Sequence, residues 1–170
     1  MLSNLPVASF NGFSKNSSFE ILPSLFLSIL LKIFSNSSYF RISAWCGLKL
    51  LYFSANRHED WQSKPVNSEI FQFTLAERKL SQLTDRNGPD SRPAVSPDGK
   101  LIAYVGYDDR KLAHQANRLY VMNTDGSNIR NLTEDLDRAI DDFQWLANSK
   151  ALYISYDSEG KGILAEQALS

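Results

Sequence analysis

Few side chains in this chain could carry out a reaction, and they are far apart in the sequence. Its 170 residues include two histidines, His58 and His114, and one cysteine, Cys46. A single cysteine excludes both an intrachain disulfide and a Cys-x-x-Cys metal or redox site. Ser96 lies in the sequence Ser-Pro-Asp-Gly, but a serine nucleophile needs a base beside it and a strained turn of the Gly-x-Ser-x-Gly type. The sequence contains no such pentapeptide, so we interpret Ser96 as a turn residue.

Neither histidine stands in a pattern that indicates catalysis or metal binding. His58 precedes two adjacent acidic residues, which would point to opposite sides of a strand, and we expect it in a solvated loop. His114 is also expected in a loop, from which it could contact a neighbouring domain or a substrate. The acidic stretch 134–142 lacks the glycine and the terminal glutamate of a calcium loop. The sequence therefore predicts no catalytic, cofactor-binding or metal-binding residue, and no cofactor.

Composition and charge favour a soluble globular protein without a charged macromolecular partner. The chain is 43% hydrophobic and 22% charged, and its formal net charge is −1. Nothing in this balance indicates binding to nucleic acid or to an anionic membrane. The average hides a division, because residues 1–54 contain 12 serines and only five charged residues.

The segment 1–41 is different from the rest of the chain, and we treat it as a separate region. Its apolar run at 21–34 is interrupted by Lys32 and is shorter than the roughly 20 residues of a membrane-spanning helix. Lys15 and the apolar run supply two parts of a signal peptide, but the residues at 35–37 form a poor cleavage site. The segment is signal-like, disordered or a spurious extension. The protein would be periplasmic or secreted in the first case and cytoplasmic otherwise.

From residue 50 onward the sequence repeats with a period of about 50 residues, and several independent landmarks agree on it. Residues 119–123 resemble 70–74 at an offset of 49, and a Leu-Thr pair follows each of these runs at the same distance. Residues 95–100 align with 145–150 at an offset of 50. Such self-similarity is the sequence signature of a repeat architecture.

Each repeat is predicted to form four antiparallel strands. In the best-defined unit these are a short strand at 94–95, then 101–105, 118–122 and 129–132. Asp-Gly pairs mark the reversals between them, since glycine accepts the positive φ of a tight turn. Four strands in 40–50 residues are typical of a β-propeller blade. Four aromatic residues are expected to pack between blades: Tyr104, Tyr120, Trp145 and Tyr153.

The predicted fold class is all-β, an incomplete β-propeller of about two and a half four-stranded blades with a non-propeller segment before it. The partial propeller occupies 42–170, with blades at about 42–92, 93–141 and 142–170. Because closed propellers have four to eight blades, we expect a fragment of a larger propeller that is marginally stable or prone to aggregate by itself.

The repeat resembles the "SPDGK" repeat of TolB-type propellers. More narrowly, it resembles the N-terminal propeller of the prolyl oligopeptidase family of serine peptidases. The resemblance covers about 50–162 and is carried by three motifs: Leu-Thr-Asp-Arg-Asn-Gly-Pro-Asp at 83–90, Pro-Ala-Val-Ser-Pro-Asp-Gly-Lys at 93–100 and Leu-Tyr-Val-Met-Asn-Thr-Asp-Gly-Ser-Asn at 119–128. The pattern departs at Trp45–Lys49, where the turn motif lacks Asp-Gly, and at 146–149, where Asn148 is expected to supply the left-handed turn.

The resemblance implies a non-catalytic propeller portion of a peptidase. In that family the propeller limits peptide access to a separate α/β-hydrolase domain, which holds the serine nucleophile. Expected partners are such a hydrolase domain or other propeller blades, with peptides as the ligands of full-length relatives, and neither nucleic acid nor membrane. The alternative from another class is a TolB-type propeller module for protein–protein binding, and a broken gene without function is a third possibility.

Overall fold

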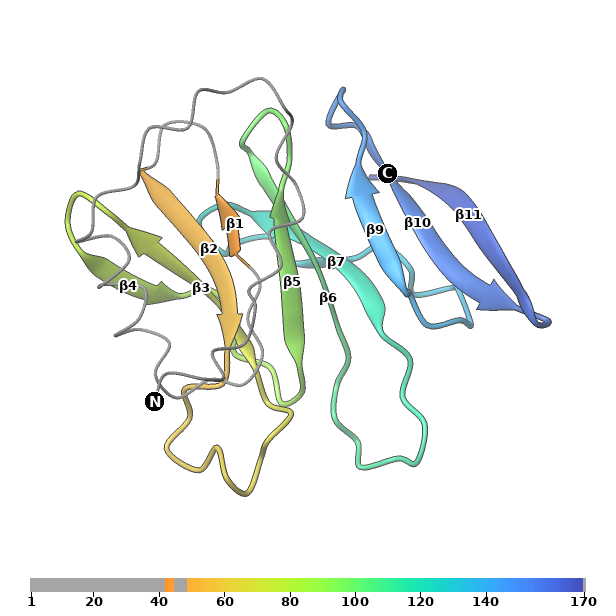
Figure 1. Ribbon diagram of the computed structural model, residues 1–170, viewed down its shortest axis with the longest axis horizontal. Helices are drawn as coiled ribbons and strands as arrows, with labels where there is room; N and C mark the ends of the chain where they lie inside the picture. The colour runs from red at the N-terminus through yellow and green to blue at the C-terminus, as the bar shows by residue number, and fades with distance from the viewer. Residues whose placement is uncertain (1–41, 45–48, 170) are drawn as a thin grey trace, which may run out of the picture. The chain divides into compact units, whose positions relative to one another are not determined.

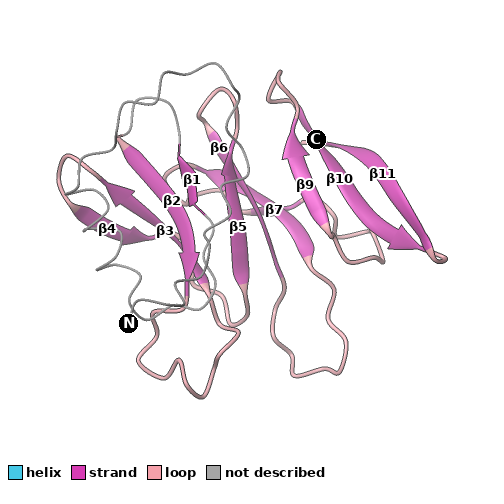
Figure 2. Ribbon diagram, in the orientation of Figure 1, coloured by secondary structure: helices cyan, strands magenta, loops and turns pink. Residues whose placement is uncertain are grey.

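The computed structural model describes residues 42–44 and 49–169, which form strands and loops only (Figure 2). The predicted separate segment 1–41 and most of the degraded motif at 45–49 lie outside the described residues. No helix long and apolar enough to cross a membrane occurs within the described ranges. The described strands form three antiparallel sheets (Figure 1).

In the first two sheets, each strand pairs with the strand that follows it in the chain. The first sheet has the order β1-β2-β3-β4 and the second β5-β6-β7-β8. Their bounds are β1 Ile42–Ala44, β2 Leu50–Ala55, β3 Glu69–Thr74, β4 Lys79–Gln82, β5 Asp90–Val95, β6 Leu101–Gly106, β7 Arg118–Asn123 and β8 Arg130–Asn131. The four strands predicted for the second unit are all present, and β5 begins four residues earlier than the strand predicted at 94–95.

The third sheet has three described strands in the order β9-β10-β11. They are β9 Asp142–Trp145, β10 Ala151–Ser158 and β11 Lys161–Ala168. Strands β10 and β11 pair over eight residues each and are joined by a tight turn at Glu159 and Gly160, both of which have positive φ.

Alternation along the strands determines how the sheets pack. On β6, Ile102 and Tyr104 lie in a core shared with Tyr52 and Ile70 of the first sheet. Ala103 and Val105, which alternate with these two residues along β6, belong to a second core that includes residues of the third sheet. Because successive side chains of a strand point to opposite faces, the second sheet is buried on both sides. Hydrophobic residues fill both of its faces.

The turn that precedes β6 has the geometry that its sequence predicts. Gly99 has a φ of 74°, and its N–H donates to the Ser96 carbonyl oxygen at 2.8 Å. In the next repeat the hairpin is kept, but the left-handed residue is Ser149 (φ 59°) and not Asn148. Asn148 instead accepts the Lys150 N–H on its side-chain oxygen at 2.9 Å. The hairpin is therefore kept, as expected, but the Asn148 side chain stabilises the turn and the residue after it makes the reversal.

Candidate functional site

Ser96 is a structural residue of a turn. Its side chain is completely buried, its hydroxyl donates to the Asp98 carboxylate at 2.6 Å, and it accepts the Leu101 N–H at 3.0 Å. These bonds occupy the hydroxyl, and the first of them lowers the pKa of Asp98. A nucleophile would need access to substrate and a base within reach, so the structure confirms the interpretation of Ser96 as a turn residue.

The polar groups with the most unusual surroundings lie between the first and second sheets. We call them the junction cluster: His58, Glu69, Thr84, Arg86 and Asp90. His58 belongs to the loop after β2, Thr84 and Arg86 lie in the link between β4 and β5, and Glu69 and Asp90 are the first residues of β3 and β5. Both carboxylate residues are only 1% exposed.

Thr84 connects the backbone of β3 to the cluster. Its hydroxyl accepts the Ile70 N–H at 2.9 Å and donates to Glu69 Oε2 at 2.7 Å. The other oxygen of Glu69, Oε1, lies 3.4 Å from His58 Nε2, and neither atom makes a hydrogen bond. Glu69 is therefore held firmly on one side and only loosely on the other.

Arg86 is the cation of the cluster. Its guanidinium forms an ion pair with the Asp90 carboxylate, lies 4.1 Å from the centre of the Tyr120 ring, and has Asp108 3.6 Å from Nε. Tyr120 stacks in turn on the buried Tyr104 at 5.4 Å. A planar guanidinium suits this combination of carboxylate pairing and aromatic contact.

Gly106 leaves the space that this ion pair fills. A β-carbon at this position would lie 2.4 Å from Arg86 Nη2, 2.4 Å from Asp90 Oδ1 and 2.3 Å from the Pro89 carbonyl oxygen. Real β-carbon contacts are essentially never this short. The close approach of the ion pair to β6 therefore requires glycine at the end of this strand.

Burial shifts the acid–base behaviour of both carboxyl groups. Loss of solvent raises the pKa of Asp90 to about 6, although the neighbouring Arg86 opposes the change. Burial also raises the pKa of Glu69, against the hydrogen bond from Thr84. Desolvation disfavours the charged form of a carboxyl group, so both residues hold a proton more readily than an exposed acid does.

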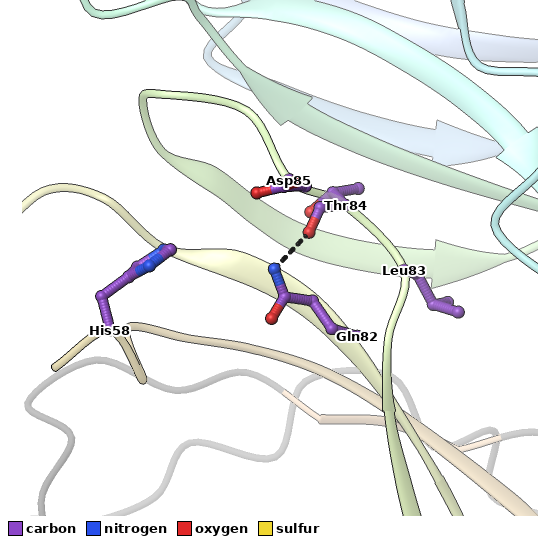
Figure 3. A pocket seen from close by; sticks show the side chains of 5 residues that line it. All are labelled: His58, Gln82, Leu83, Thr84 and Asp85. Carbon is purple, nitrogen blue, oxygen red and sulfur yellow. Dashed lines mark hydrogen bonds between the residues drawn. The ribbon is translucent and has the colours of Figure 1, made fainter.

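A polar hollow of about 510 Å³ lies beside the cluster, lined by His58, Gln82, Leu83, Thr84 and Asp85. Figure 3 shows the His58 ring on one side and Gln82 and Asp85 on the other, with the Leu83 side chain directed away from them. The Gln82 amide donates to the Thr84 carbonyl oxygen at 2.8 Å. The hollow places the half-buried imidazole of His58 between solvent and Glu69.

The repeat itself does not require these charges. In the next unit the positions of Glu69, Arg86 and Asp90 are taken by Arg118, Asp135 and Ile140, respectively. Two backbone bonds support the alignment: the Asp90 N–H donates to Ser68 and the Ile140 N–H to Asn117. Ile140 is 1% exposed and belongs to the hydrophobic core.

Sequence reasoning located the loops correctly but missed the cluster. His114 lies in an exposed loop as expected, whereas the ring of His58 is only 28% exposed and lies against Glu69. His58 therefore lies in an inter-strand loop, as expected, but its side chain is half-buried instead of solvated. Glu69, Arg86 and Asp90 were not singled out as candidates. A comparison of the two repeats could have found them. Each of these charged residues stands where the next repeat has either an opposite charge or an apolar residue.

The four aromatic residues expected in the core behave differently from one another. Tyr104 is buried, Tyr120 packs beside it, and Trp145 packs against the second core and donates its indole N–H to the Ala94 carbonyl oxygen at 2.9 Å. Tyr153 is 46% exposed. It points to the face of the third sheet that no described strand covers, so its packing between blades stays a prediction.

Comparison with known proteins supports the repeat interpretation. No family model matches the chain. The chain is 26% identical over 124 residues to dipeptidyl-peptidase 5 of Porphyromonas gingivalis, an alignment that covers 72% of this chain and 18% of the relative. The chain therefore spans less than a fifth of the length of this peptidase.

Solved structures show the same arrangement of strands. A protein described as TolB from Agrobacterium tumefaciens superposes with a TM-score of 0.60 at 13% identity, covering 79% of this chain and 47% of that one. The β-propeller domain of the Trilobed protease from Pyrococcus furiosus gives a TM-score of 0.58 at 15% identity, with 78% and 38% covered. The described residues form part of a β-propeller. The propeller part consists of two four-stranded blades and three strands of another, and it resembles both TolB-type propellers and the propeller domains of prolyl oligopeptidase-family peptidases.

Most side chains around the hollow are polar, but they do not form a metal site. No three His, Cys, Asp or Glu side chains within 42–44 and 49–169 are grouped so that they could hold a metal ion. Of the titratable groups in the junction cluster, only His58 lines the hollow. The hollow therefore exposes the imidazole of His58 and leaves the two buried carboxyl groups behind it.

Proposed function

We propose that this chain is a non-catalytic propeller part of a prolyl oligopeptidase-like serine peptidase. The observation that carries the proposal is the 124-residue alignment with a dipeptidyl-peptidase, which takes in 72% of the chain. In the family that the repeat resembles, the propeller limits peptide access to a separate hydrolase domain. The chain would contribute to such a barrier and leave the bond cleavage to other residues.

The chemistry of the described residues agrees with a non-catalytic role. Ser96 is buried and its hydroxyl is used within its own turn. His58 lies against a carboxylate, but its Nε2 faces Glu69 Oε1, so the imidazole is not presented to a serine hydroxyl as a general base. A catalytic triad needs a nucleophile, a base and an orienting acid in one chain of hydrogen bonds.

We place the contact with a further blade on the outer face of the third sheet. Tyr153 and Leu164 are 46% and 74% exposed on this face. The equivalent face of the second sheet carries Ala103 and Val105. Both residues are fully buried, because the third sheet packs against that face. A blade of the same repeat is the occupant that this equivalence favours, since each blade buries its apolar face only against a neighbour.

Two measurements test the peptidase relationship. The purified chain should not hydrolyse proline-containing or acyl-blocked peptides, and hydrolysis sensitive to a serine inhibitor would overturn the proposal. The coding DNA beside this sequence should specify a Gly-x-Ser-x-Gly elbow with downstream Asp and His, in the same or a shifted frame. Further Ser-Pro-Asp-Gly repeats without a hydrolase segment would instead support the TolB-type module for protein–protein binding.

A further inference from the structure

The junction cluster contains more buried acid than permanent buried base. Glu69 and Asp90 are each 1% exposed, and Arg86 is the guanidinium placed among them. If both carboxyl groups ionise, the cluster carries a net negative charge away from water. An uncompensated buried charge is strongly unfavourable, and such a group commonly takes up a proton instead.

The geometry indicates where such a proton would be held. Asp90 already has Arg86 as its ion-pair partner. His58 Nε2 and Glu69 Oε1 lie 3.4 Å apart, both are buried atoms, and neither makes a hydrogen bond. A proton added to this pair would cancel the excess negative charge of the cluster and would permit a hydrogen bond across the 3.4 Å contact in either tautomer of the imidazole. The hollow lined by His58 gives solvent access to the imidazole side of this pair.

We infer that the junction between the first two blades binds one proton at the His58–Glu69 pair, and that this proton holds the blades together more tightly in acid than in base. The inference does not depend on the peptidase relationship. It rests on the charge count of the cluster and on two buried atoms that lack other hydrogen bonds.

Asp90 also takes up a proton in this pH range, because burial raises its pKa to about 6, whereas the other charged and titratable groups around the pair do not. Asp85 and Asp108 are exposed, and Asp60 pairs with Lys64 at 2.8 Å outside the cluster. The groups that face the pair from the packed elements are Asp60 and Lys64 of the loop after β2, Asp85, Arg86 and Asp90, and beyond them Tyr104, Asp108 and Tyr120. Burial raises the pKa of both tyrosines, so they stay neutral, and the exposed acids are screened by water.

The sign of the effect follows from proton linkage. The closed junction binds the proton more tightly than the open junction, in which both groups return to water. The equilibrium constant for opening therefore rises with pH, by about tenfold per pH unit at most for one proton. The raised pKa of Glu69 agrees in direction, because a carboxyl that prefers its proton in the folded state loses stability as pH rises through its folded pKa.

The next blade junction supplies an internal control within the same molecule. The Asp90 N–H donates to the Ser68 carbonyl oxygen at 2.6 Å, and the Ile140 N–H donates to the Asn117 carbonyl oxygen at 2.9 Å. The two bonds are equivalent in the repeat, but Ile140 lies in an apolar core. Hydrogen exchange of these two amides reports the opening of the two junctions separately.

The experiment measures amide protection factors in the full chain between pH 5 and pH 8. The protection of the Asp90 amide relative to the Ile140 amide should fall by about three- to tenfold per pH unit over part of this range. A ratio that is constant across the range would overturn the inference. Because protection factors already include the base catalysis of intrinsic exchange, the ratio isolates the junction.

Variants then assign the effect to the pair. Glu69→Gln imitates the protonated acid, so the ratio at pH 8 should rise toward the wild-type value at pH 5, and its pH dependence should fall to the part that Asp90 contributes. His58→Gln should reduce the pH dependence, while His114→Gln and Asp135→Asn, both at exposed positions, should leave it unchanged. A Glu69→Gln variant that keeps the wild-type slope would contradict the inference, since the slope would then come from Asp90. If this variant does not fold, His58→Gln decides, and a wild-type slope in His58→Gln would overturn the inference in the same way.

Discussion

Asp90 and Ile140 occupy the same position in two successive blades, yet one is a buried carboxylate and the other a core hydrocarbon. Each lies at the entry to its blade, and each donates its N–H to the residue before the third strand of the preceding blade, Ser68 or Asn117. Both side chains are 1% exposed. The backbone is conserved between the two junctions, while the chemistry that fills them differs.

This pairing predicts a large difference between single and double substitutions. Asp90→Ile should destabilise the chain by about 3 kcal/mol, because it removes the buried partner of Arg86 and leaves only the exposed Asp108 near its charge. The double variant Arg86→Met, Asp90→Ile should recover most of that loss, since well-packed apolar residues often replace a buried ion pair without cost. Urea unfolding of the three proteins measures both values. A double variant as unstable as the single one would show that the ion pair is not the source of the loss.

Gly106 should tolerate no side chain, whereas a glycine in the third sheet should. Gly106→Ala forces a β-carbon to within 2.4 Å of both Arg86 and Asp90, and overpacking of this kind costs about 1–3 kcal/mol. The control is Gly162→Ala, where the nearest atom, Asp157 Oδ1, is 3.8 Å away. Thermal unfolding should show a clear loss in the first variant and almost none in the second. Equal losses of stability in the two variants would mean that the effect comes from replacing any strand glycine by alanine and not from the close contacts at Gly106.

Two equivalent threonines should differ in their contribution to stability. Thr133 accepts the Leu119 N–H at 2.9 Å, as Thr84 accepts the Ile70 N–H at 2.9 Å. Valine at either position removes this acceptor, at about 1–3 kcal/mol for the unsatisfied donor. Thr84→Val should cost more than Thr133→Val, because it also removes the hydrogen bond to the buried Glu69. Denaturant titration ranks the two, and the reverse order would show that Glu69 does not depend on Thr84.

The outer face of the third sheet should control self-association. Replacing Tyr153 and Leu164 by serine removes exposed apolar surface from a sheet face, and such surfaces favour aggregation. Light scattering of the double variant should show less aggregate than that of the wild type at the same concentration. Leu112→Ser is the matched control, because Leu112 is 61% exposed but lies in a loop. An equal reduction of aggregate in the Leu112→Ser variant would show that the outer face of the third sheet is not the specific source of self-association.

The two aspartates of neighbouring motifs should titrate far apart. The pKa of Asp90 is raised to about 6 by burial, whereas hydrogen bonds from Ser96 and the Lys100 N–H lower the pKa of Asp98. Asp90 therefore contributes stability below about pH 4 that is lost as the pH rises through about 6. Asp98 has the opposite pH dependence. Because its pKa is lowered in the folded chain, it contributes stability when it is ionised, and that stability is lost as the pH falls through its folded pKa. Carboxyl carbon chemical shifts followed by NMR give both midpoints, and a normal midpoint for Asp90 would show that water reaches it.

The strands and turns followed from the sequence because they depend on local rules. Alternation along 101–105 and the Asp-Gly reversals are properties of a few adjacent residues, and the 50-residue offset repeats them. The propeller architecture could be predicted on that basis. The left-handed residue of the third blade could not, since Asn148 and Ser149 both allow the turn and the contacts of their side chains decide between them.

The sequence by itself determined the repeat, the strand order within each sheet and the turn role of Ser96. The tertiary structure alone decided that Glu69, Arg86 and Asp90 share one buried junction, because these residues are separated by up to 21 positions and join only when the first two blades pack. Charged residues at the ends of strands are ordinarily solvated. Whether a charge is exposed or buried depends on what the neighbouring blade places over it, and no local pattern carries that information.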